Sequence, residues 1–247
     1  MKRLDWRLKV ALLLVVLSAV LYCIHYAIFG DIHHIWIYLV GDIAFLPVQV
    51  LLVTLIIDNL LSQREKKVRL KKMNMVIGAF FSEVGTPLIR AFQRFDPAAE
   101  EMARQLVVDG QWTDARFAEA VAHVRGRQAT IDPRRGDLVG LRDLLAARRE
   151  FLLRLLENPN LLEHESFTDL LWATFHLTEE LQARHDLTRS PESDLAHLAG
   201  DIHRAYMVLV AQWLAYMKHL RADYPYLFSL AVRTNPFDTK ASVEVMA

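Results

Sequence analysis

Two long apolar runs dominate the first sixty residues. Residues 10–29 contain no Asp, Glu, Lys or Arg, and residues 35–57 contain only one such residue, Asp42. Runs of this length match the roughly 20 residues that a helix needs to cross a bilayer core at about 1.5 Å per residue. The connection, residues 30–34, leaves room only for an antiparallel return. The pattern therefore predicts a two-helix transmembrane hairpin over residues 1–58.

Basic residues flank the outer ends of this hairpin, and residues 30–34 contain neither Lys nor Arg. The cluster behind the second run consists of Arg64, Lys66, Lys67, Arg69, Lys71 and Lys72. Because Lys and Arg are enriched on the cytoplasmic side of membrane spans, both termini are predicted to lie in the cytoplasm. The predicted location is the inner (cytoplasmic) membrane. The cluster either only sets this topology or also binds anionic lipid head groups.

Polar residues inside the two runs fall at matching depths. In an antiparallel hairpin, residues at equal depth share one sum of residue numbers, as do the pairs His25–Asp42 and Ser18–Gln49. A spacing of seven places the polar residues of each run on one helical face. A carboxylate in hydrocarbon needs a partner or water, and His25 is the expected partner of Asp42. Three interpretations stay open: hydrogen bonds within the hairpin or an oligomer, a proton or ion path, and an outward-facing metal or pH sensor.

The second run also contains Pro47, which predicts a kink because proline cannot donate the helical hydrogen bond. Behind this run, residues 59–84 predict a continuous juxtamembrane helix, here called the stalk. Its apolar positions recur every three or four residues and are Leu70, Met73, Ile77, Phe80 and Val84. This seam predicts either a self-associating stalk or packing against later helices.

Gly85, Thr86 and Pro87 follow the stalk and predict a helix end, an N-cap and the first turn of a new helix. They are the predicted hinge between the stalk and the rest of the chain. The surrounding stretch, FFSEVGTPLIRAF, resembles the phospho-acceptor box of sensor histidine kinases, S-H-E-L-R-T-P-L, over its E-V-G-T-P-L part. However, Ser82 stands where that family has its reactive histidine, and no glycine pattern for an ATP site follows. The resemblance therefore predicts no kinase activity.

Residues 86–236 carry apolar positions with helical periodicity, separated by turn residues. The predicted helices cover residues 97–108, 113–128, 137–157, 161–185, 194–222 and 225–233, with a break at residues 158–160, and Thr113 is the expected N-cap of the second. Together they predict a cytoplasmic helical bundle, followed by a frayed tail over residues 237–247. The fold class predicted for the whole chain is all-α.

The composition excludes several classes of function. Lys and Arg number 29, as do Asp and Glu, so the chain has no global attraction to nucleic acid, and no nucleic-acid partner is predicted. The single cysteine, Cys23, excludes an intrachain disulfide. Motifs of common hydrolases and metalloproteases do not occur, and no cofactor is predicted.

One segment of the bundle is rich in acidic residues and histidine. Asp169, His176 and Glu179 share a face of one predicted helix, and His197 and Asp201 share a face of the next. Such residues on facing helices can form a metal site, although the E-x-x-H motif of ferritin-like proteins is absent. The alternatives are a solvated acidic rim and a docking surface for a basic partner.

These patterns together predict an integral membrane protein that forms a homo-oligomer and is not an enzyme. Its cytoplasmic bundle would bind a protein partner or relay a signal through the second span. The alternative function is an oligomeric ion or proton conductor whose path is lined by the second span, including Asp42 and Gln49. A third alternative is a metal-dependent enzyme built on the helical bundle.

Overall fold

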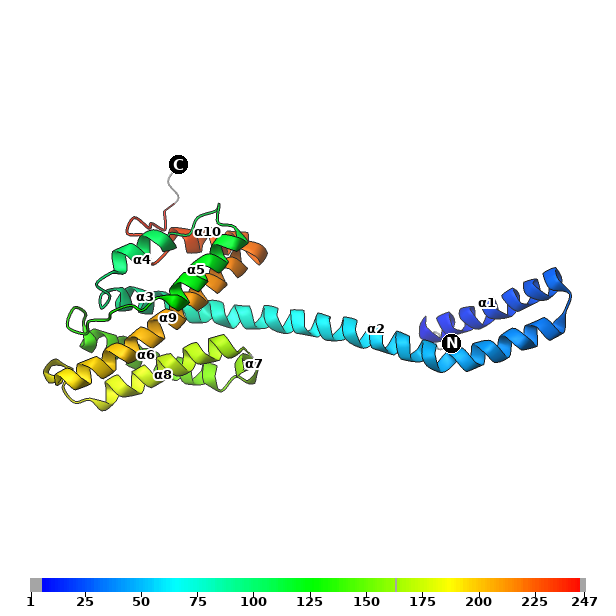
Figure 1. The fold of residues 1–247 in the computed structure, drawn as a ribbon, viewed down its shortest axis with the longest axis horizontal. Coiled ribbons are helices and arrows are strands. Elements are labelled where there is room, and N and C mark those ends of the chain that lie inside the picture. The colour runs from blue at the N-terminus through cyan, green and yellow to red at the C-terminus, as the bar shows by residue number, and fades with distance from the viewer. Residues whose placement is uncertain (1–5, 163, 245–247) are drawn as a thin grey trace, which may run out of the picture. The chain divides into compact units, whose positions relative to one another are not determined.

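The computed structural model of the protein describes residues 6–162 and 164–244, and the regular structure within these ranges is entirely helical. The prediction of an all-α fold is therefore confirmed. The chain divides into two compact units, Met1–Lys67 and Val68–Ala247, whose helices are labelled in Figure 1.

The first unit is a helical hairpin made of α1 (Trp6–Phe29) and the first part of α2 (Ile32–Phe80). Gly30, at φ 64°, donates its N–H to the carbonyl of Tyr26 at 2.8 Å and closes the end of α1. Glycine suits this left-handed conformation because it has no side chain to clash. The carboxylate of Asp31 accepts the N–H of His33 at 2.8 Å and caps the start of α2.

Both helices of the hairpin expose their apolar side chains. The most apolar parts of Lys9–Phe29 and Ile35–Arg64 have mean hydropathies of 2.4 and 2.2, and neither contains a buried residue. By length and composition, both stretches are compatible with membrane association. A third stretch, Met73–Gln93, is also long and apolar enough, but 44% of its most apolar part is buried inside the protein. Its apolar face therefore belongs to a protein core.

The seam of the predicted stalk packs inside the second unit. Met73, Ile77, Phe80 and Val84 are all buried, with Ile77 only 4% exposed; the side chain of Leu70 lies outside the described part of the structure. Of the two alternatives, packing against later helices is confirmed for these four residues. A self-associating stalk held by Ile77 is wrong, because that side chain is already covered by its own chain.

The helix break predicted at Gly85 is wrong. Phe81–Gly85 form a π-helical turn, and α3 (Thr86–Gln93) follows without interruption. Gly85 and Thr86 keep right-handed helical backbone angles, and the N–H of Thr86 donates to the carbonyl of Phe81. No side chain makes a capping hydrogen bond at the start of α3, so Thr86 is not the predicted N-cap. Pro87 does lie in the first turn of α3, as predicted. Bending at these residues stays a prediction.

A proline follows the π-turn closely. A π-turn adds one residue to the helix and leaves a carbonyl without its usual helical donor. Pro87, which has no N–H to donate, lies two residues after the turn ends, inside the first turn of α3. Pro47 likewise lies inside α2, which continues on both sides of it.

The second unit continues through a series of helices connected by short loops. These are α4 (Ala99–Leu106), α5 (Asp114–Gly126), α6 (Leu138–Leu156), α7 (Pro159–Leu162), α8 (Glu165–Ala183), α9 (Glu192–Asp223) and α10 (Pro225–Arg233). A 3-10 turn, Leu187–Arg189, connects α8 to α9. Thr113 is the N-cap of α5, as predicted, because its hydroxyl accepts the N–H of Arg116 at 3.3 Å.

The helix predicted over residues 161–185 is instead divided: residues 161 and 162 belong to α7, which begins at Pro159, and α8 begins only at Glu165. The ring of His164 accepts the N–H of Phe167 at 3.2 Å and so caps the start of α8. Histidine is not among the residues that normally signal an N-cap, which is why the sequence pattern gave no break there.

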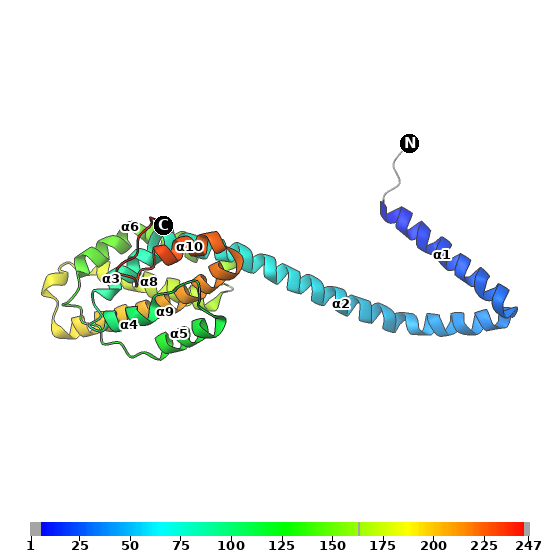
Figure 2. The same cartoon turned by 90° about the horizontal axis from the view of Figure 1, so that it is seen from above.

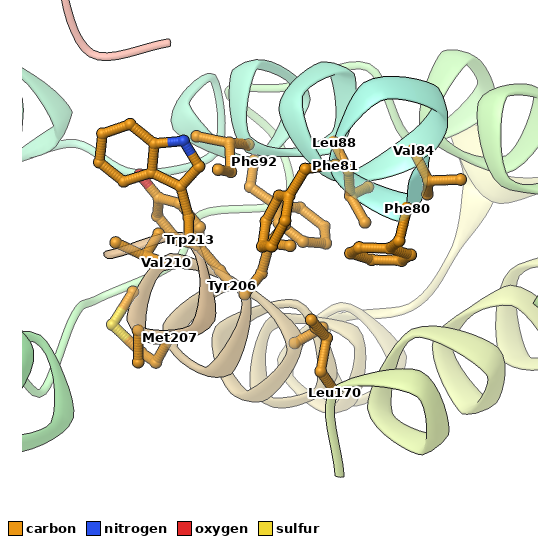
Figure 3. Packing of buried hydrophobic residues seen from close by; sticks show 14 of the residues in the cluster. Phe80, Phe81, Val84, Leu88, Phe92, Leu170, Tyr206, Met207, Val210 and Trp213 are labelled. Carbon is orange, nitrogen blue, oxygen red and sulfur yellow. The ribbon is translucent and has the colours of Figure 1, made fainter. Parts of the chain in front are cut away.

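α9 is the central helix of the bundle, and α3, α5, α8 and α10 pack against it. Figures 1 and 2 show α9 between α5 and α8. In Figure 3, Phe80 and Phe92 from the α2–α3 segment lie close to side chains of α9 such as Tyr206. The rings of Phe92 and Tyr206 are 5.6 Å apart, and Phe81 stacks on Tyr216 at 5.1 Å. This aromatic contact joins the end of α2 to the bundle.

The predicted tail begins within the packed fold. Phe237 is 3% exposed, and its ring lies 5.2 Å from that of Trp213 on α9. The side chain of Asn235 donates to the carbonyl of Leu106 at 3.1 Å. These contacts hold the chain against the bundle past the end of α10.

Replacing Gly85 with alanine is expected to reduce the free energy of unfolding by about 1–3 kcal/mol, because the new methyl group would overlap the ring of Phe81. Gly200→Ala is the matched control, since Gly200 lies inside α9 with no atom within 4 Å of the added methyl group. It is expected to stabilise the protein by up to about 1 kcal/mol through helix propensity. Thermal unfolding followed by circular dichroism measures both. Equal effects of the two substitutions would contradict the described packing of the π-turn.

Candidate functional site

Three of the four predicted polar residues of the hairpin come together. Ser18, His25 and Asp42 line a groove of about 530 Å³ between α1 and α2. The Nε2 atom of His25 is buried and has no hydrogen-bond partner. Among the described residues, no hydrogen bond or ion pair connects His25 with Asp42. The predicted direct pair is therefore not formed, although both side chains face one groove.

The fourth residue, Gln49, does not line this groove. Figure 2 shows α1 and α2 diverging from the turn that connects them. The equal-depth pairing assumed two helices in contact along their whole length, and this divergence separates the positions farthest from the turn. The register therefore does not extend to Ser18 and Gln49.

The predicted basic cluster lies on α2, where Arg64 is exposed. The backbone of the other members is helical, but their side chains lie outside the described part of the structure; these are Lys66, Lys67, Arg69, Lys71 and Lys72. Binding of anionic lipid by this cluster stays a prediction.

A group of histidine and carboxylate side chains lies between α8 and α9. His176 and Glu180 project from α8, and His197 and Asp201 project from α9. The Nε2 atom of His176 lies 3.6 Å from Oδ2 of Asp201 and 3.9 Å from Oε1 of Glu180. The Nε2 atom of His197 lies 3.3 Å from the same Asp201 oxygen and 3.5 Å from Oε2 of Glu180. Two imidazoles and two carboxylates thus converge at one point, here called the histidine–carboxylate cluster.

Three residues of the predicted metal site, His176, His197 and Asp201, belong to this cluster, and two do not. Glu179 points elsewhere and lies 3.7 Å from Arg149 of α6. Asp169 is exposed near the other end of α8. Glu180 is the residue that the sequence interpretation missed. A spacing of four in both His176–Glu180 and His197–Asp201 was the available signal, because residues four apart on a helix lie on one face.

The carboxylate of Asp201 is the most enclosed member of the cluster. Its side chain is 5% exposed, whereas the side chains of His176 and His197 are 46% and 54% exposed. The Oδ1 atom lies 3.3 Å from Arg204, but Oδ2 is buried and has no hydrogen-bond partner. A buried oxygen in this situation is unusual, because losing water without gaining a donor is costly.

Arg184 holds the other carboxylate of the cluster in place. Its guanidinium donates to Oε2 of Glu180 at 2.8 Å and to both oxygens of Asp194 at 2.6–3.1 Å. The hydrogen bonds from Arg184 lower the pKa of the Glu180 and Asp194 carboxyls, against the opposing effect of burial. Both groups are therefore ionised at neutral pH, when Glu180 can act as a ligand for a cation.

A second groove, of about 610 Å³, lies beside the π-turn. Ser82 lines it together with aromatic residues of α9 and α10 such as Tyr216 and Tyr226. His219 also lines it; its Nδ1 lies 2.9 Å from Asp223, while its Nε2 is buried without a hydrogen-bond partner. Ser82, the residue in the position of the kinase histidine, thus lies at a groove whose described lining residues include no Asp, Glu, Lys or Arg.

Comparison with known proteins matches the chain over nearly its full length. The family model of the N-terminal helical domain of MJ1433 matches residues 2–61, and the model of the C-terminal helical domain of that uncharacterized protein matches residues 69–233. Uncharacterized protein MJ1433 from Methanocaldococcus jannaschii is 45% identical over 238 residues, which cover 96% of each chain. No solved structure matches the chain. The gap between the two matched domains coincides with the boundary between the two structural units.

Arg184→Ala is expected to reduce the free energy of unfolding by about 1–3 kcal/mol near pH 7, since two charge-assisted hydrogen-bond partners are lost. Lowered pKa values in the folded state contribute stability above the ordinary carboxyl range near 4, and this contribution is lost as the pH falls through the lowered values. The difference between wild type and variant should therefore shrink in acid. Urea unfolding at several pH values measures it.

Arg189→Ala is the control for this experiment, because that side chain is 89% exposed and its nearest carboxylate oxygen, on Asp186, is 3.7 Å away. Its free energy of unfolding should match that of the wild type. A deficit in Arg184→Ala that stays constant from neutral to acid pH would show that Arg184 acts by packing and not through these carboxylates.

Proposed function

The chain belongs to the MJ1433 family of two-domain helical proteins, and on that premise we propose that it is a membrane-anchored relay protein. In this proposal, α1 and the apolar part of α2 anchor the chain in the cytoplasmic membrane. The C-terminal bundle lies in the cytoplasm, where it binds a protein partner or passes on a signal from the anchor.

The observation that carries the proposal is the exposure of both apolar stretches. Lys9–Phe29 and Ile35–Arg64 bury none of their most apolar residues within the chain. Large continuous apolar surfaces are rare on proteins in water and mark contact with lipid or another protein. At about 1.5 Å per residue, each stretch is long enough for a hydrocarbon core of about 30 Å.

The distribution of charge supports an orientation with both termini in the cytoplasm. Residues 30–34, between the two stretches, contain neither Lys nor Arg, whereas basic residues flank both outer ends. Arg64 and the basic residues that follow it would then lie close to the anionic inner leaflet.

α2 supports the relay part of the proposal, because one helix contributes to both units. It begins at Ile32 in the hairpin and ends at Phe80, which is fully buried in the bundle core. A continuous helix is stiff, so displacement of its membrane part would be transmitted to the residues packed around Phe80.

The polar groove of the hairpin supports assembly into a homo-oligomer. Asp42 and His25 line a groove that remains open along the hairpin. A carboxylate facing hydrocarbon is costly, so a second copy of the chain covering the groove would stabilise these side chains.

The same groove favours a second candidate function, an oligomeric proton or ion path. Ser18, His25 and Asp42 place ionisable and hydroxyl groups along one cavity between two apolar helices. Chains of such groups are typical of proton relays in membrane proteins. In this candidate function the path lies between neighbouring hairpins.

The anchoring proposal predicts opposite labelling of two introduced cysteines in a Cys23→Ser background. Asp31→Cys, in the turn between α1 and α2, should react with a membrane-impermeant maleimide on intact cells. Ser193→Cys, exposed at the start of α9, should react only after the cells are opened. Labelling of Ser193→Cys in intact cells, or protection of Asp31→Cys there, would reject the proposed orientation.

The conducting candidate predicts that purified wild-type protein in liposomes dissipates a proton gradient and that Asp42→Asn abolishes this flux, because the carboxylate that carries the proton is removed. A pH-sensitive dye inside the liposomes measures the flux. Asp58→Asn is the control, since Asp58 does not line the groove. Wild-type flux no faster than that of empty liposomes would eliminate this candidate and leave the relay proposal unaffected.

A further inference from the structure

The histidine–carboxylate cluster repeats the same pair of residue types on two helices, a regularity that is not expected of a solvated acidic rim. Each of the two helices supplies one histidine and, four residues later, one carboxylate: His176 and Glu180 from α8, His197 and Asp201 from α9. Residues with this spacing lie on one helical face. Because α8 packs directly on α9, the two faces meet and both imidazoles turn Nε2 toward the carboxylates.

The separations from His197 match those around a single ion, whereas those from His176 lie at and beyond the upper limit. Tetrahedral ligands at about 2.0–2.2 Å from a metal lie roughly 3.3–3.6 Å from one another. The four histidine–carboxylate separations are 3.3, 3.5, 3.6 and 3.9 Å. The ligand atoms of Glu180, His197 and Asp201 all lie within 4.8 Å of one another. We propose that this cluster binds a divalent transition-metal ion, with Zn²⁺ as the best fit.

The unpartnered oxygen of Asp201 points to the same conclusion. Oδ2 is buried, accepts no hydrogen bond and faces the Nε2 atoms of both His176 and His197. One divalent ion held by Glu180, His197 and Asp201 would neutralise both carboxylates and give this buried oxygen a partner.

Two arginines also contact the carboxylates of the cluster. Arg204 lies 3.3 Å from Oδ1 of Asp201, which leaves Oδ2 directed at the histidines. Arg184 donates to Oε2 of Glu180, while Oε1 lies toward His176. Such outer contacts orient ligands in metal sites. The positive charge of both arginines also offsets the mutual repulsion of the two carboxylates.

The types of ligand select the class of ion. Imidazole with carboxylate suits Zn²⁺ and neighbouring transition metals, whereas Ca²⁺ and Mg²⁺ prefer oxygen alone. The half-exposed histidines give an ion access from solvent. Since the ligands come from two helices, a bound ion would cross-link α8 and α9. This proposal does not depend on whether the hairpin spans a membrane, and its test can succeed or fail independently.

The test uses the full-length protein, purified in detergent and freed of metal with a chelator. Titration calorimetry with Zn²⁺ should give one ion per chain. Co²⁺ should give the intense visible absorption of a four-coordinate nitrogen and oxygen site. A hundredfold excess of Zn²⁺ over the dissociation constant should raise the Tm by about 5–10 °C.

Substitutions within the cluster should weaken Zn²⁺ binding by at least about tenfold. His176→Ala and His197→Ala are the primary variants, because half-exposed side chains can be removed without opening the core. Asp201→Asn tests the buried ligand, with its Tm in chelator reporting whether the fold is kept. Glu179→Gln, next to Glu180 but outside the cluster, is the matched control and should bind Zn²⁺ like the wild type.

Two results would overturn the proposal. One is the absence of stoichiometric Zn²⁺ binding by the wild type. The other is equal binding by the wild type and by folded His197→Ala, which would assign the ion to another surface.

Discussion

The contact between α9 and the apolar face of residues 73–92 is the interaction on which the bundle depends. Phe80, Phe92 and Leu88 are fully buried in it, as is Tyr206 on α9. Aromatic side chains bury large areas and pack with defined ring geometry, so they fix both the position and the rotation of a helix. Residues 73–92 are hydrophobic enough to resemble a third span, yet this contact makes them part of a protein core. It also keeps the helix continuous through the π-turn, because a break at Gly85 would separate Phe81 from Leu88 on the shared face.

The same contact sets the orientation of the histidine–carboxylate cluster. Because one face of α9 packs against the α2–α3 segment, the face that carries His197 and Asp201 is turned toward α8. The buried neighbours of Asp201, Leu198 and Ile202, lie in the core on the same turns of α9. A charged residue held this close to a core needs compensation by other charges. The arginines and histidines around Asp201 supply part of it, and the proposed ion would complete it.

The hairpin has the opposite physical character, since no residue in the most apolar parts of its two helices is buried by its own chain. Its polar groups lie in the angle between two diverging helices and not in a tight helix pair. One helix, α2, joins a bundle with a buried core to a hairpin with exposed apolar side chains. This division agrees with the two matched domains of the family, and it explains why substitutions in the cluster can be studied separately from the hairpin.

The amino-acid sequence by itself determined the local features of this protein. Hydrophobic runs predicted the two apolar helices, and periodicity with local capping at Thr113 predicted most helices of the bundle. Such features depend on residues within a few positions of one another. The tertiary structure decided what depends on distant contacts. Gly85 and Pro87 read locally as a break, but packing against α9 keeps the helix whole. Glu179 and Glu180 lie three and four residues after His176, spacings that both allow a shared helical face, and the rotation of α8 against α9 decides that Glu180 meets His197. Rotation and pairing of helices are set by side chains far apart in the chain, so the sequence pattern could identify the faces but not which of them meet.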